Sequence, residues 1–528
     1  MKLTDHDIRQ IDQDYVFSLS LDELRSLTMN LLDDLKIATD RLNQNSTNSS
    51  IPPSKQPLWA DGSQSDDDEG TETPNDEASS IPSDEGEKDK PAPDNEENES
   101  SITSDDSDTI ENVKRKPGKQ PGAPGCGRKL ELPITGTIIH KASSCAACNQ
   151  SLGDDSSFVA TTGLYVLDIE DAGNGMTGIN VSHIKHLYGE TECTCGHKTA
   201  TTPGRCKTED GWTVSLTEWH LCGPMLVSLI VCLSKRLRLS RAKIQEFLND
   251  WLGIWLGIGT INQCIHEAGR AMEPIKEQLI EEIHSSDLLH IDETSWKEKS
   301  EGLWLWVFTT ATICLFLIGP RTKAIAASIL KGFSGWIMTD GYNAYRHYDK
   351  RLRCWAHLIR KCKGLSESVD QKAQEFGKQG IDFFKVLEDA IYAAREGPEV
   401  IDIVEIYSDQ LDQFKELCIA NRESSHEKTR ELAREFLNDW DAIWQVLSDI
   451  SFPLTNNEAE QALRHWVIDR LISFGTRTQE GSHAFSLLAS IIETCRKRNV
   501  LPWPYIAQVV GERRKGNDAP ALPAVVAK

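Results

Sequence analysis

Apolar residues near the N-terminus repeat with the three-four spacing of a coiled-coil helix. The repeat consists of Leu21, Leu24, Leu31, Leu35 and Leu42. Ser20 and Glu23 have the spacing of a capping box, which predicts that a helix begins there. Three heptads are enough to pair two chains, although a helix docked on its own chain would show the same repeat. Self-association is the preferred interpretation.

A second pattern begins near residue 286, where short apolar runs predict strands. The runs are LLHIDETSW, LWLWVFTT, TICLFLI and GWIMTDGYNAY, and a helical stretch, TKAIAASILKGF, separates the last two. Three antiparallel strands, a helix and a strand beside the first form the start of a ribonuclease-H-like domain. Asp292 and Asp340 would then end adjacent strands.

Two carboxylates in that position suit metal-assisted chemistry on phosphate. Oxygen ligands are preferred by Mg²⁺ and Mn²⁺, and two such ions about 3.5–4 Å apart support an in-line phosphoryl displacement. A single acid at a strand end is usually only solvated. The prediction of a catalytic metal site therefore depends on Asp292 and Asp340 together.

Helical patterns flank and interrupt this domain. Residues 366–450 have Trp, Phe and Leu spaced for burial, which predicts an all-α insertion. Residues 208–285 are also helical and contain a helix, a Gly-containing break and a second helix beginning near Thr260. The basic residues that lead into them are Lys235, Arg236, Arg238, Arg241 and Lys243. A helix-turn-helix can read DNA, but helical hairpins also serve as packing units, so both interpretations stay open.

The 14 cysteines of this 528-residue chain are too sparse for a disulfide scaffold, and one cluster has metal-ligand spacing. Cys145 and Cys148 form a CxxC pair, and Cys193 and Cys195 form a CxC pair. Two close pairs of thiolates suit a tetrahedral, structural Zn²⁺, with a small β unit between them. The alternative fourth ligands are His140, His197 and Cys206.

The formal charge of −24 is concentrated in one segment. Residues 61–111 contain 20 Asp or Glu and two Lys, with few large apolar residues, so they are predicted to form a disordered tether. Solvation is the preferred explanation of this charge, and mimicry of DNA is the alternative. A Gly/Pro-rich basic arm follows, with Lys114, Arg115, Lys116, Lys119, Arg128 and Lys129. It can follow a phosphate backbone, although a solubilising linker would have the same composition.

No apolar run reaches the length of a membrane-spanning helix, and the N-terminus lacks the basic start and apolar stretch of a secretory signal. Neither a membrane partner nor export is expected, so the cytoplasm is the default location.

These patterns predict a multidomain α/β protein. The expected units are an N-terminal coiled-coil helix (1–48), an acidic linker (49–113), a basic arm (114–129), a zinc-binding module (130–207), a helical DNA-binding region (208–285), a ribonuclease-H-like core in two parts (286–365 and 451–498), an all-α insertion (366–450) and a C-terminal tail (499–528).

Taken in order, the motifs resemble those of bacterial transposases of the insertion sequence 66 type, which carry a DDE set of acids. The resemblance covers nearly the whole chain, from the leucine-rich helix through KPGKQPGAPG and the cysteine pairs to the core. HIDETSW and TDGYNAY match the first two catalytic motifs, and NNEAEQALRHWVIDR matches the segment with the catalytic glutamate. The long acidic insertion departs from the family pattern.

The resemblance implies specific roles for residues of the core. Asp292, Asp340 and Glu460 would hold two Mg²⁺ or Mn²⁺ ions, with Glu460 rather than Glu458 as the third acid. Arg464 lies one helical turn from Glu460, where it could contact phosphate or orient the carboxylate, as could Asn456 and Asn457. In the family-like segment CWAHLIRK, a structural role for Cys354 and His357 is preferred over contact with metal or DNA.

The implied activity is transposition. The protein would bind the ends of an insertion sequence, cut a DNA strand by hydrolysis and join the freed 3′-hydroxyl to target DNA. Its partners would be DNA, further copies of the chain and accessory proteins encoded by the element, at the bacterial nucleoid. A ribonuclease-H-like nuclease or resolvase, and a transposase-derived regulator that binds DNA without cutting it, are the alternatives. The complete set of acids disfavours the regulator.

Overall fold

The computed structural model describes residues 16, 18–44, 48, 132–170, 179–202, 205–207, 213–215, 221–397 and 402–526. The acidic linker lies outside these residues. So does the basic arm with its candidate DNA-binding residues Lys114, Arg115, Lys116, Lys119, Arg128 and Lys129.

A five-stranded mixed sheet forms the core of the second half of the chain. Its strands are β7 (Leu288–Glu298), β8 (Glu301–Thr309), β9 (Cys314–Gly319), β10 (Trp336–Thr339) and β11 (Arg351–Arg353). The order across the sheet is β11-β10-β7-β8-β9. β7, β8 and β9 are antiparallel neighbours, whereas β10 is parallel to both β7 and β11. The prediction of three antiparallel strands, a helix and a strand beside the first is confirmed, since α8 (Lys323–Leu330) separates β9 from β10.

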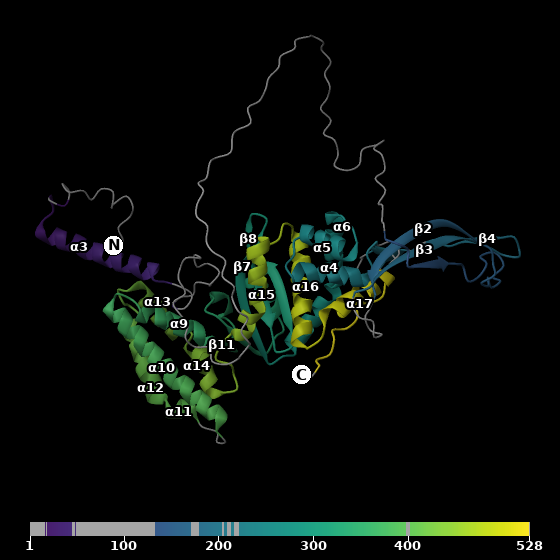
Figure 1. Ribbon diagram of the computed structural model, residues 1–528. Helices are drawn as coiled ribbons and strands as arrows, with labels where there is room; N and C mark the ends of the chain where they lie inside the picture. Colours follow the sequence, from purple (N-terminus) through teal and green to yellow (C-terminus); the bar gives the residue numbers. More distant parts are fainter. Residues whose placement is uncertain are drawn as a thin grey trace, which may run out of the picture. The chain divides into compact units, whose positions relative to one another are not determined.

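Helices α15 (Asn457–Ser473) and α16 (Gln479–Lys497) pack against this sheet (Figure 1). Two buried hydroxyls fix α16 to β9, because Ser490 Oγ accepts from the Phe316 amide at 2.8 Å and Thr494 Oγ1 from the Cys314 amide at 3.0 Å. Trp466 of α15 packs edge-on against Phe316, with ring centroids 5.9 Å apart. The sequences of β8 and β9 are almost continuously apolar because helices cover the sheet to which these strands belong.

Four helices precede the sheet and share its hydrophobic core. They are α4 (Pro224–Lys235), α5 (Arg241–Leu252), α6 (Ile258–Ala271) and α7 (Glu273–His284). The predicted Gly-containing break is present, since α5 ends at Gly253, whose φ of 65° is left-handed. α6 packs so closely on α16 that a Cβ at Gly269 would lie 2.5 Å from the Cβ of Ala484. Most of α6 is therefore covered, and its exposed residues lie mainly in its first turns.

The C-terminal segment is not the tail that the sequence suggested. It forms α17 (Pro502–Lys515), which packs against α4 and α6. Arg514 is fully buried and pairs with Glu267 of α6 at 2.7 Å. This pairing satisfies two charges that would otherwise be costly to bury, so α17 belongs to the packed core.

A second hydrophobic core belongs to helices inserted between β11 and α15. These are α9 (Trp355–Ser366), α10 (Gln371–Glu396), α11 (Ile403–Ile406), α12 (Ser408–Asn421), α13 (Glu427–Asn438) and α14 (Trp440–Ser448). The rings of Trp355, Phe384 and Trp444 meet at centroid distances of 5.1–5.5 Å. Because Trp355 is part of this core, the helical insertion begins earlier than the expected residue 366.

The N-terminal helix α3 (Leu21–Leu42) begins with the expected capping box. The Ser20 hydroxyl accepts from the Glu23 amide, and the Glu23 carboxylate accepts from the Ser20 amide. Asp40 joins α3 to the helical insertion, since it accepts from Ser368 Oγ at 2.7 Å and lies 3.1 Å from His426 Nε2. No residue of α3 is buried, and its exposed leucines include Leu21, Leu31, Leu35 and Leu42.

The cysteine-containing region forms a separate small sheet with the order β1-β3-β2, in which β4 also pairs with β3. Its strands are β1 (Gly136–His140), β2 (Phe158–Ile169), β3 (Val181–Glu192) and β4 (Lys198–Ala200), and a short pair follows, β5 (Arg205–Lys207) and β6 (Thr213–Ser215). Asp168 in β2 accepts from the Leu226 amide in the first turn of α4 at 2.8 Å. Within the described part of the chain, none of the helices combines the length and apolar composition needed to cross a lipid bilayer.

Candidate active site

Two of the predicted acids lie on adjacent parallel strands. Asp340 directly follows β10, as expected, whereas Asp292 lies within β7 rather than at its end, because β7 continues to Glu298 in its pairing with β8. Burial raises the pKa of Asp292 well above its usual range, and the carboxylates of Asp340, Glu293 and Glu460 raise it further. Like charges that converge in this way are disfavoured unless a cation joins them. The group therefore has the electrostatics of a cation site.

Glu460 approaches this group from the first turn of α15. Its Oε1 lies 3.7 Å from Nδ1 of His357 in α9. Burial lowers the pKa of His357, and the negative charge of Glu460 opposes that effect. The other acid of the turn, Glu458, is instead paired with Lys497 at 2.7 Å. The two glutamates therefore differ: Glu458 pairs with Lys497, whereas the charge of Glu460 raises the pKa of Asp292.

Asn456, the residue before α15, holds the helix to the strand that carries Asp292. Its Nδ2 donates to the Ile291 carbonyl at 2.8 Å, and its Oδ1 lies 3.0 Å from His290 Nδ1. Its backbone amide donates to the sulfur of Cys354 at 3.3 Å. Burial raises the pKa of the Cys354 thiol to about 11, so it stays protonated at neutral pH.

Donor atoms of Cys354, His357 and Glu460 all lie within 4.8 Å of one another. The sulfur of Cys354 also accepts the hydrogen bond from Asn456, and its structural role stays a prediction. His357 differs from Cys354 because it faces a predicted catalytic acid.

Sequence reasoning missed the group around Glu293, the neighbour of Asp292. The Glu293 side chain is 1% exposed and accepts two hydrogen bonds from Arg321 and one from the Tyr345 hydroxyl. The Arg321 guanidinium lies between the rings of Trp304 and Tyr342, 4.3 and 4.2 Å from their centroids. Burial and nearby Asp340 raise the pKa of Glu293 to about 7 in spite of these partners. The adjacent Asp-Glu sequence offered no signal to separate the two acids.

Comparison with known proteins identifies the family. Residues 220–484, about half of the chain, match the family described as "Transposase IS66 family". The chain belongs to the transposase IS66 family. The resemblance inferred from the motifs is thereby confirmed.

Two curated relatives of this IS66 family chain come from Sinorhizobium fredii (strain NBRC 101917 / NGR234). The uncharacterized protein y4qI is 23% identical over 318 residues, which cover 53% of this chain and 57% of the relative. The uncharacterized protein y4hP is 22% identical over 300 residues, which cover 49% of this chain and 53% of the relative. The chain thus spans little more than half the length of these relatives.

The part of the IS66 family chain that matches the family runs from just before α4 into α16. It contains Asp292, Asp340 and Glu460, as well as the basic cluster that begins at Lys235. The four clustered cysteines lie outside it.

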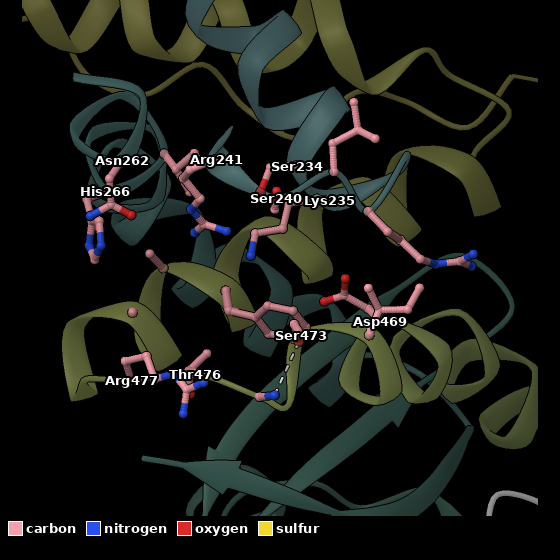
Figure 2. A pocket seen from close by; sticks show the side chains of 18 of the residues that line it. Ser234, Lys235, Ser240, Arg241, Asn262, His266, Asp469, Ser473, Thr476 and Arg477 are labelled. Carbon is pink, nitrogen blue, oxygen red and sulfur yellow. Dashed lines mark hydrogen bonds between the residues drawn. The ribbon is translucent and has the colours of Figure 1, made fainter. Parts of the chain in front are cut away.

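The basic cluster of this IS66 family chain is partly buried rather than uniformly exposed. Lys235 ends α4 and is 6% exposed, and Arg241 begins α5. Both residues line one cavity (Figure 2). Arg236 and Arg238 both donate to Nδ1 of His465 in α15, at 3.2 and 2.7 Å. These contacts attach the cluster to the helix that carries Glu460.

Two other predicted DNA-binding residues lie on the surface. Lys243 is exposed and pairs with Glu246 of the same helix at 2.8 Å. Arg464 is exposed on α15, one turn after Glu460. Both side chains are therefore accessible to a phosphate backbone.

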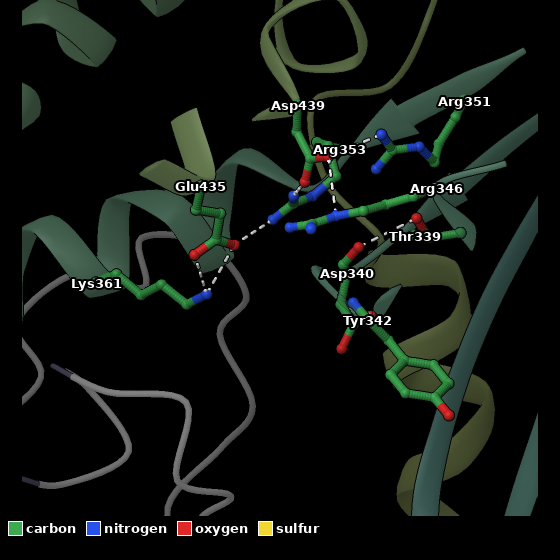
Figure 3. Close-up of polar contacts among 9 residues, drawn as sticks. All are labelled: Thr339, Asp340, Tyr342, Arg346, Arg351, Arg353, Lys361, Glu435 and Asp439. Atoms are coloured by element: carbon green, nitrogen blue, oxygen red, sulfur yellow. Dashed lines mark hydrogen bonds and ion pairs between the residues drawn. The ribbon is translucent and has the colours of Figure 1, made fainter. Parts of the chain in front are cut away.

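A network of arginines and acids surrounds the segment after Asp340 (Figure 3). Asp439, at the start of α14, is fully buried and pairs with Arg351 at 2.8 Å, with Arg346 at 3.4 Å and, more closely still, with Arg353. Arg353 also pairs with Glu435 of α13 at 2.6 Å. A Cβ at position 341 would lie 2.7 Å from Oε1 of Glu435, so Gly341 allows the network to approach the chain directly beside Asp340.

The four predicted cysteine ligands lie close together at one end of the small sheet. Sγ of Cys145 lies 3.7 Å from Sγ of Cys195, and Sγ of Cys148 lies 3.6 Å from that of Cys193. All four sulfurs lie within 4.8 Å of one another. The backbone amide of Cys148 lowers the pKa of Cys145 against the effect of burial, which favours a thiolate.

The alternative fourth ligands are not part of this cluster. His140 bonds to His186 at 3.0 Å and stacks on Tyr188. His197 is exposed beside the second pair without joining the group of donor atoms, and the side chain of Cys206 lies outside the described residues.

Proposed function

We propose that this IS66 family protein is a DDE transposase that cleaves DNA at the ends of an insertion sequence and joins the 3′-hydroxyl ends to target DNA. The observation that supports this most strongly is the contrast between neighbouring acids. Asp340 and Glu460 raise the pKa of Asp292, and among the described residues no Lys or Arg side chain pairs with any of the three acids. Glu293, next to Asp292, is paired with Arg321, and Glu458, two residues before Glu460, is paired with Lys497.

The fold supports the same proposal. Three antiparallel strands followed by two parallel strands, in the order β11-β10-β7-β8-β9, have the arrangement expected of a ribonuclease-H-like core. In this interpretation the helical core of α9 to α14 is an insertion before the last catalytic acid, and α15 returns that acid to the sheet.

The donor set fits hard divalent cations. Asp292, Asp340 and Glu460 would together hold two Mg²⁺ or Mn²⁺ ions, which prefer carboxylate oxygens. When bound, such ions supply the Lewis acidity that a phosphodiester displacement requires. The remaining tasks fall to the chain itself: Asn456 fixes α15 on β7, and the Tyr342 amide, which donates to Asp340 at 2.8 Å, orients that carboxylate.

DNA is the proposed substrate and partner. Lys243 and Arg464 are exposed and would contact backbone phosphates, as would the basic arm. Since most of α6 is buried, only its first turns could contribute to reading bases in a groove.

Two further features of the proposed transposase concern assembly. We infer that the four cysteines bind one structural Zn²⁺, because a tetrahedral site with Zn–S bonds of about 2.3 Å separates its sulfurs by about 3.8 Å. The observed separations of 3.6 and 3.7 Å fit that geometry. The leucine repeat of α3 would pair with the same repeat of a second copy, since Lys36 and Asp40 engage the helical insertion while the leucines stay exposed.

The proposed activity is tested by strand transfer of a labelled element end into supercoiled plasmid with Mg²⁺ or Mn²⁺. A transposase gives both cut ends and plasmid-joined label. Cut ends without joined product would favour the nuclease or resolvase alternative, and binding without cutting would favour the regulator.

A further inference from the structure

A cavity of about 480 Å³ lies between the turn from α4 to α5, helix α6, and the turn from α15 to α16 (Figure 2). Its described lining is strongly basic and includes a single carboxylate. The charged lining residues are Lys235, Arg238, Arg241, Arg477 and Asp469. Part of the basic cluster therefore lines one side of the cavity, and the segment of Gly and Thr residues near position 475 lines another.

Lys235 is the central cation of this cavity. Only 6% of Lys235 is exposed, and its ammonium lies 4.4 Å from the centroid of the Phe485 ring. Among the described residues, no hydrogen bond or ion pair satisfies that ammonium. Burial lowers the pKa of Lys235 to about 8, so the group is still mostly protonated at neutral pH. A buried cation without a bonded anion is costly, and an anion entering the cavity would remove that cost.

Two further features of the cavity point to an anion. The Ser234 hydroxyl lines it and is buried with no hydrogen-bond partner among the described residues. Two helices also begin at its wall, α5 with the N-cap Ser240 and α16 with the N-cap Thr478. The N-termini of helices carry partial positive charge and unpaired amides, which favour phosphate.

The walls of the cavity are held in unusual backbone conformations. Arg238 has a φ of 56° and is fixed by its bond to His465, 2.7 Å long. Gly475 has a φ of 87°, and a Cβ there would lie 2.1 Å from the Lys297 carbonyl oxygen. Left-handed conformations of residues other than Gly store strain, and such strain is concentrated at functional sites.

We propose that this cavity binds a backbone phosphate of the DNA substrate, close to the reacting phosphodiester. This inference rests on the proposed function. Asp469 partly offsets the charge of the cavity, but four Lys or Arg side chains outnumber it. Phe474, Leu471 and Ile472 expose apolar surface beside the cavity, at 69%, 50% and 55%, which suits contact with a nucleic-acid strand rather than a free anion.

The position of the phosphate follows from helix α15, which carries both Glu460 and Asp469. A rise of about 1.5 Å per residue separates these residues by about 14 Å along the helix. B-DNA advances about 3.4 Å per base pair, so the contacted phosphate should lie within about four base pairs of the cleaved bond.

The test is a methylphosphonate scan of a duplex carrying the terminal sequence of the encoding element, with binding measured for the Asp292→Asn protein. Neutralising one phosphate within about four base pairs of the cut should weaken binding about tenfold. Adding Lys235→Met should weaken binding to the unmodified duplex by a similar factor and remove the effect of that one modification. The slope of log affinity against log salt concentration should fall by about one.

Lys243→Met is the matched control, because Lys243 belongs to the same cluster but is exposed and should keep the position-specific loss. Arg477→Gln, at an exposed lining residue, supplies a second variant if Lys235→Met fails to fold. A position-specific loss that persists unchanged in Lys235→Met, or in Arg477→Gln if that variant replaces it, would overturn the cavity proposal. Absence of DNA binding by the parent protein would instead overturn the proposed function.

Inorganic phosphate distinguishes a free anion from the DNA backbone. If phosphate raises the melting temperature of the parent protein but not of Lys235→Met, while the methylphosphonate pattern is the same in both, the cavity takes a free anion and the assignment to DNA is wrong.

Discussion

The side-chain amide of Asn456 donates to the backbone carbonyl of Ile291, one residue before Asp292, over 2.8 Å. The same side chain also bonds to His290, so a single buried amide links the start of α15 to β7. Since α15 carries Glu460 and β7 carries Asp292, the relative position of these two acids depends on this link.

We therefore expect Asn456→Ala to reduce strand transfer strongly and to lower the free energy of unfolding by about 1–3 kcal/mol, because it leaves buried polar groups without partners. Both effects are measurable, by joining assays and by thermal unfolding. Asn457→Ala is the control, since Asn457 is exposed and adjacent. Equal activity of the two variants would show that the link does not position the acids.

The acids themselves give the second prediction. Asp292→Asn, Asp340→Asn and Glu460→Gln should each abolish cleavage and joining while leaving DNA binding largely intact, because they remove metal-binding charge rather than DNA contacts. Glu458→Gln is matched in chemistry and lies in the same helical turn, but it removes only the pairing with Lys497. It should keep most activity. Loss of activity in Glu458→Gln with retention in Glu460→Gln would move the third acid to position 458.

Much of this arrangement was predictable because it depends on local sequence. The apolar runs before Asp292 and Asp340 indicated strands, although β7 continues past Asp292 to Glu298, and the Trp, Phe and Leu spacing after residue 366 indicated helices. The local pattern could not predict which of two nearby acids pairs with a Lys or Arg side chain. Glu293 is paired across 28 residues with Arg321, and Glu458 across 39 residues with Lys497.

Burial explains the other differences from expectation. The C-terminal segment was expected to be a tail, but its buried Arg514 pairs with Glu267 across 247 residues of sequence. The basic cluster was predicted to bind DNA, whereas Lys235 is buried beside a cavity and Arg238 bonds to His465 of α15. Both outcomes depend on tertiary contacts that periodicity does not encode.

The arginine network beside Asp340 gives the third prediction. Asp439 is buried among Arg351, Arg353 and Arg346, so Asp439→Asn should destabilise the protein by about 3–5 kcal/mol by leaving buried guanidinium groups uncompensated. Glu423→Gln breaks the exposed pair with Arg434 and should cost less than about 1 kcal/mol. Chemical denaturation of the three proteins measures the difference.

This effect should depend on pH. Although burial opposes ionisation of Asp439, hydrogen bonding from Arg351 and the charge of Arg353 lower its pKa below the usual value. A carboxyl group with a lowered folded-state pKa stabilises the fold above its unfolded pKa of about 3.9 and loses that contribution as the pH falls through the folded-state pKa. The gap between wild type and Asp439→Asn should therefore narrow only in strong acid. A gap that already closes near pH 6 would contradict the assignment.

The leucine repeat of α3 gives the fourth prediction. Leu31 and Leu35 are exposed, so Leu31→Asp with Leu35→Asp should leave the fold of one chain unchanged while abolishing self-association. Light scattering after size exclusion measures the mass. Asp33→Ala changes an exposed polar residue of the same helix and should have no effect. A monomeric wild-type protein would refute pairing through α3.

The last prediction separates the two proposed metal sites by their ligands. Cys145, Cys148, Cys193 and Cys195 offer sulfur donors suited to zinc, whereas the three acids offer oxygen donors suited to Mg²⁺ or Mn²⁺. Protein purified without chelator should contain about one zinc per chain, and Cys145→Ser with Cys148→Ser should lose it. Cys232→Ser, which replaces a half-buried thiol of α4 outside the cluster, should retain the metal.

Loss of zinc should leave the rest of the chain folded and still dependent on added Mg²⁺ or Mn²⁺ for cleavage. Residues 132–202 contain no Trp, so Trp fluorescence reports unfolding of the other parts of the chain. In the double variant we expect the unfolding transition followed by Trp fluorescence to be unchanged and DNA binding to be weaker. Zinc-free wild-type protein would refute the four-thiolate site, and a Trp transition lowered by metal loss would show that the cysteine module and the sheet around Asp292 do not fold independently.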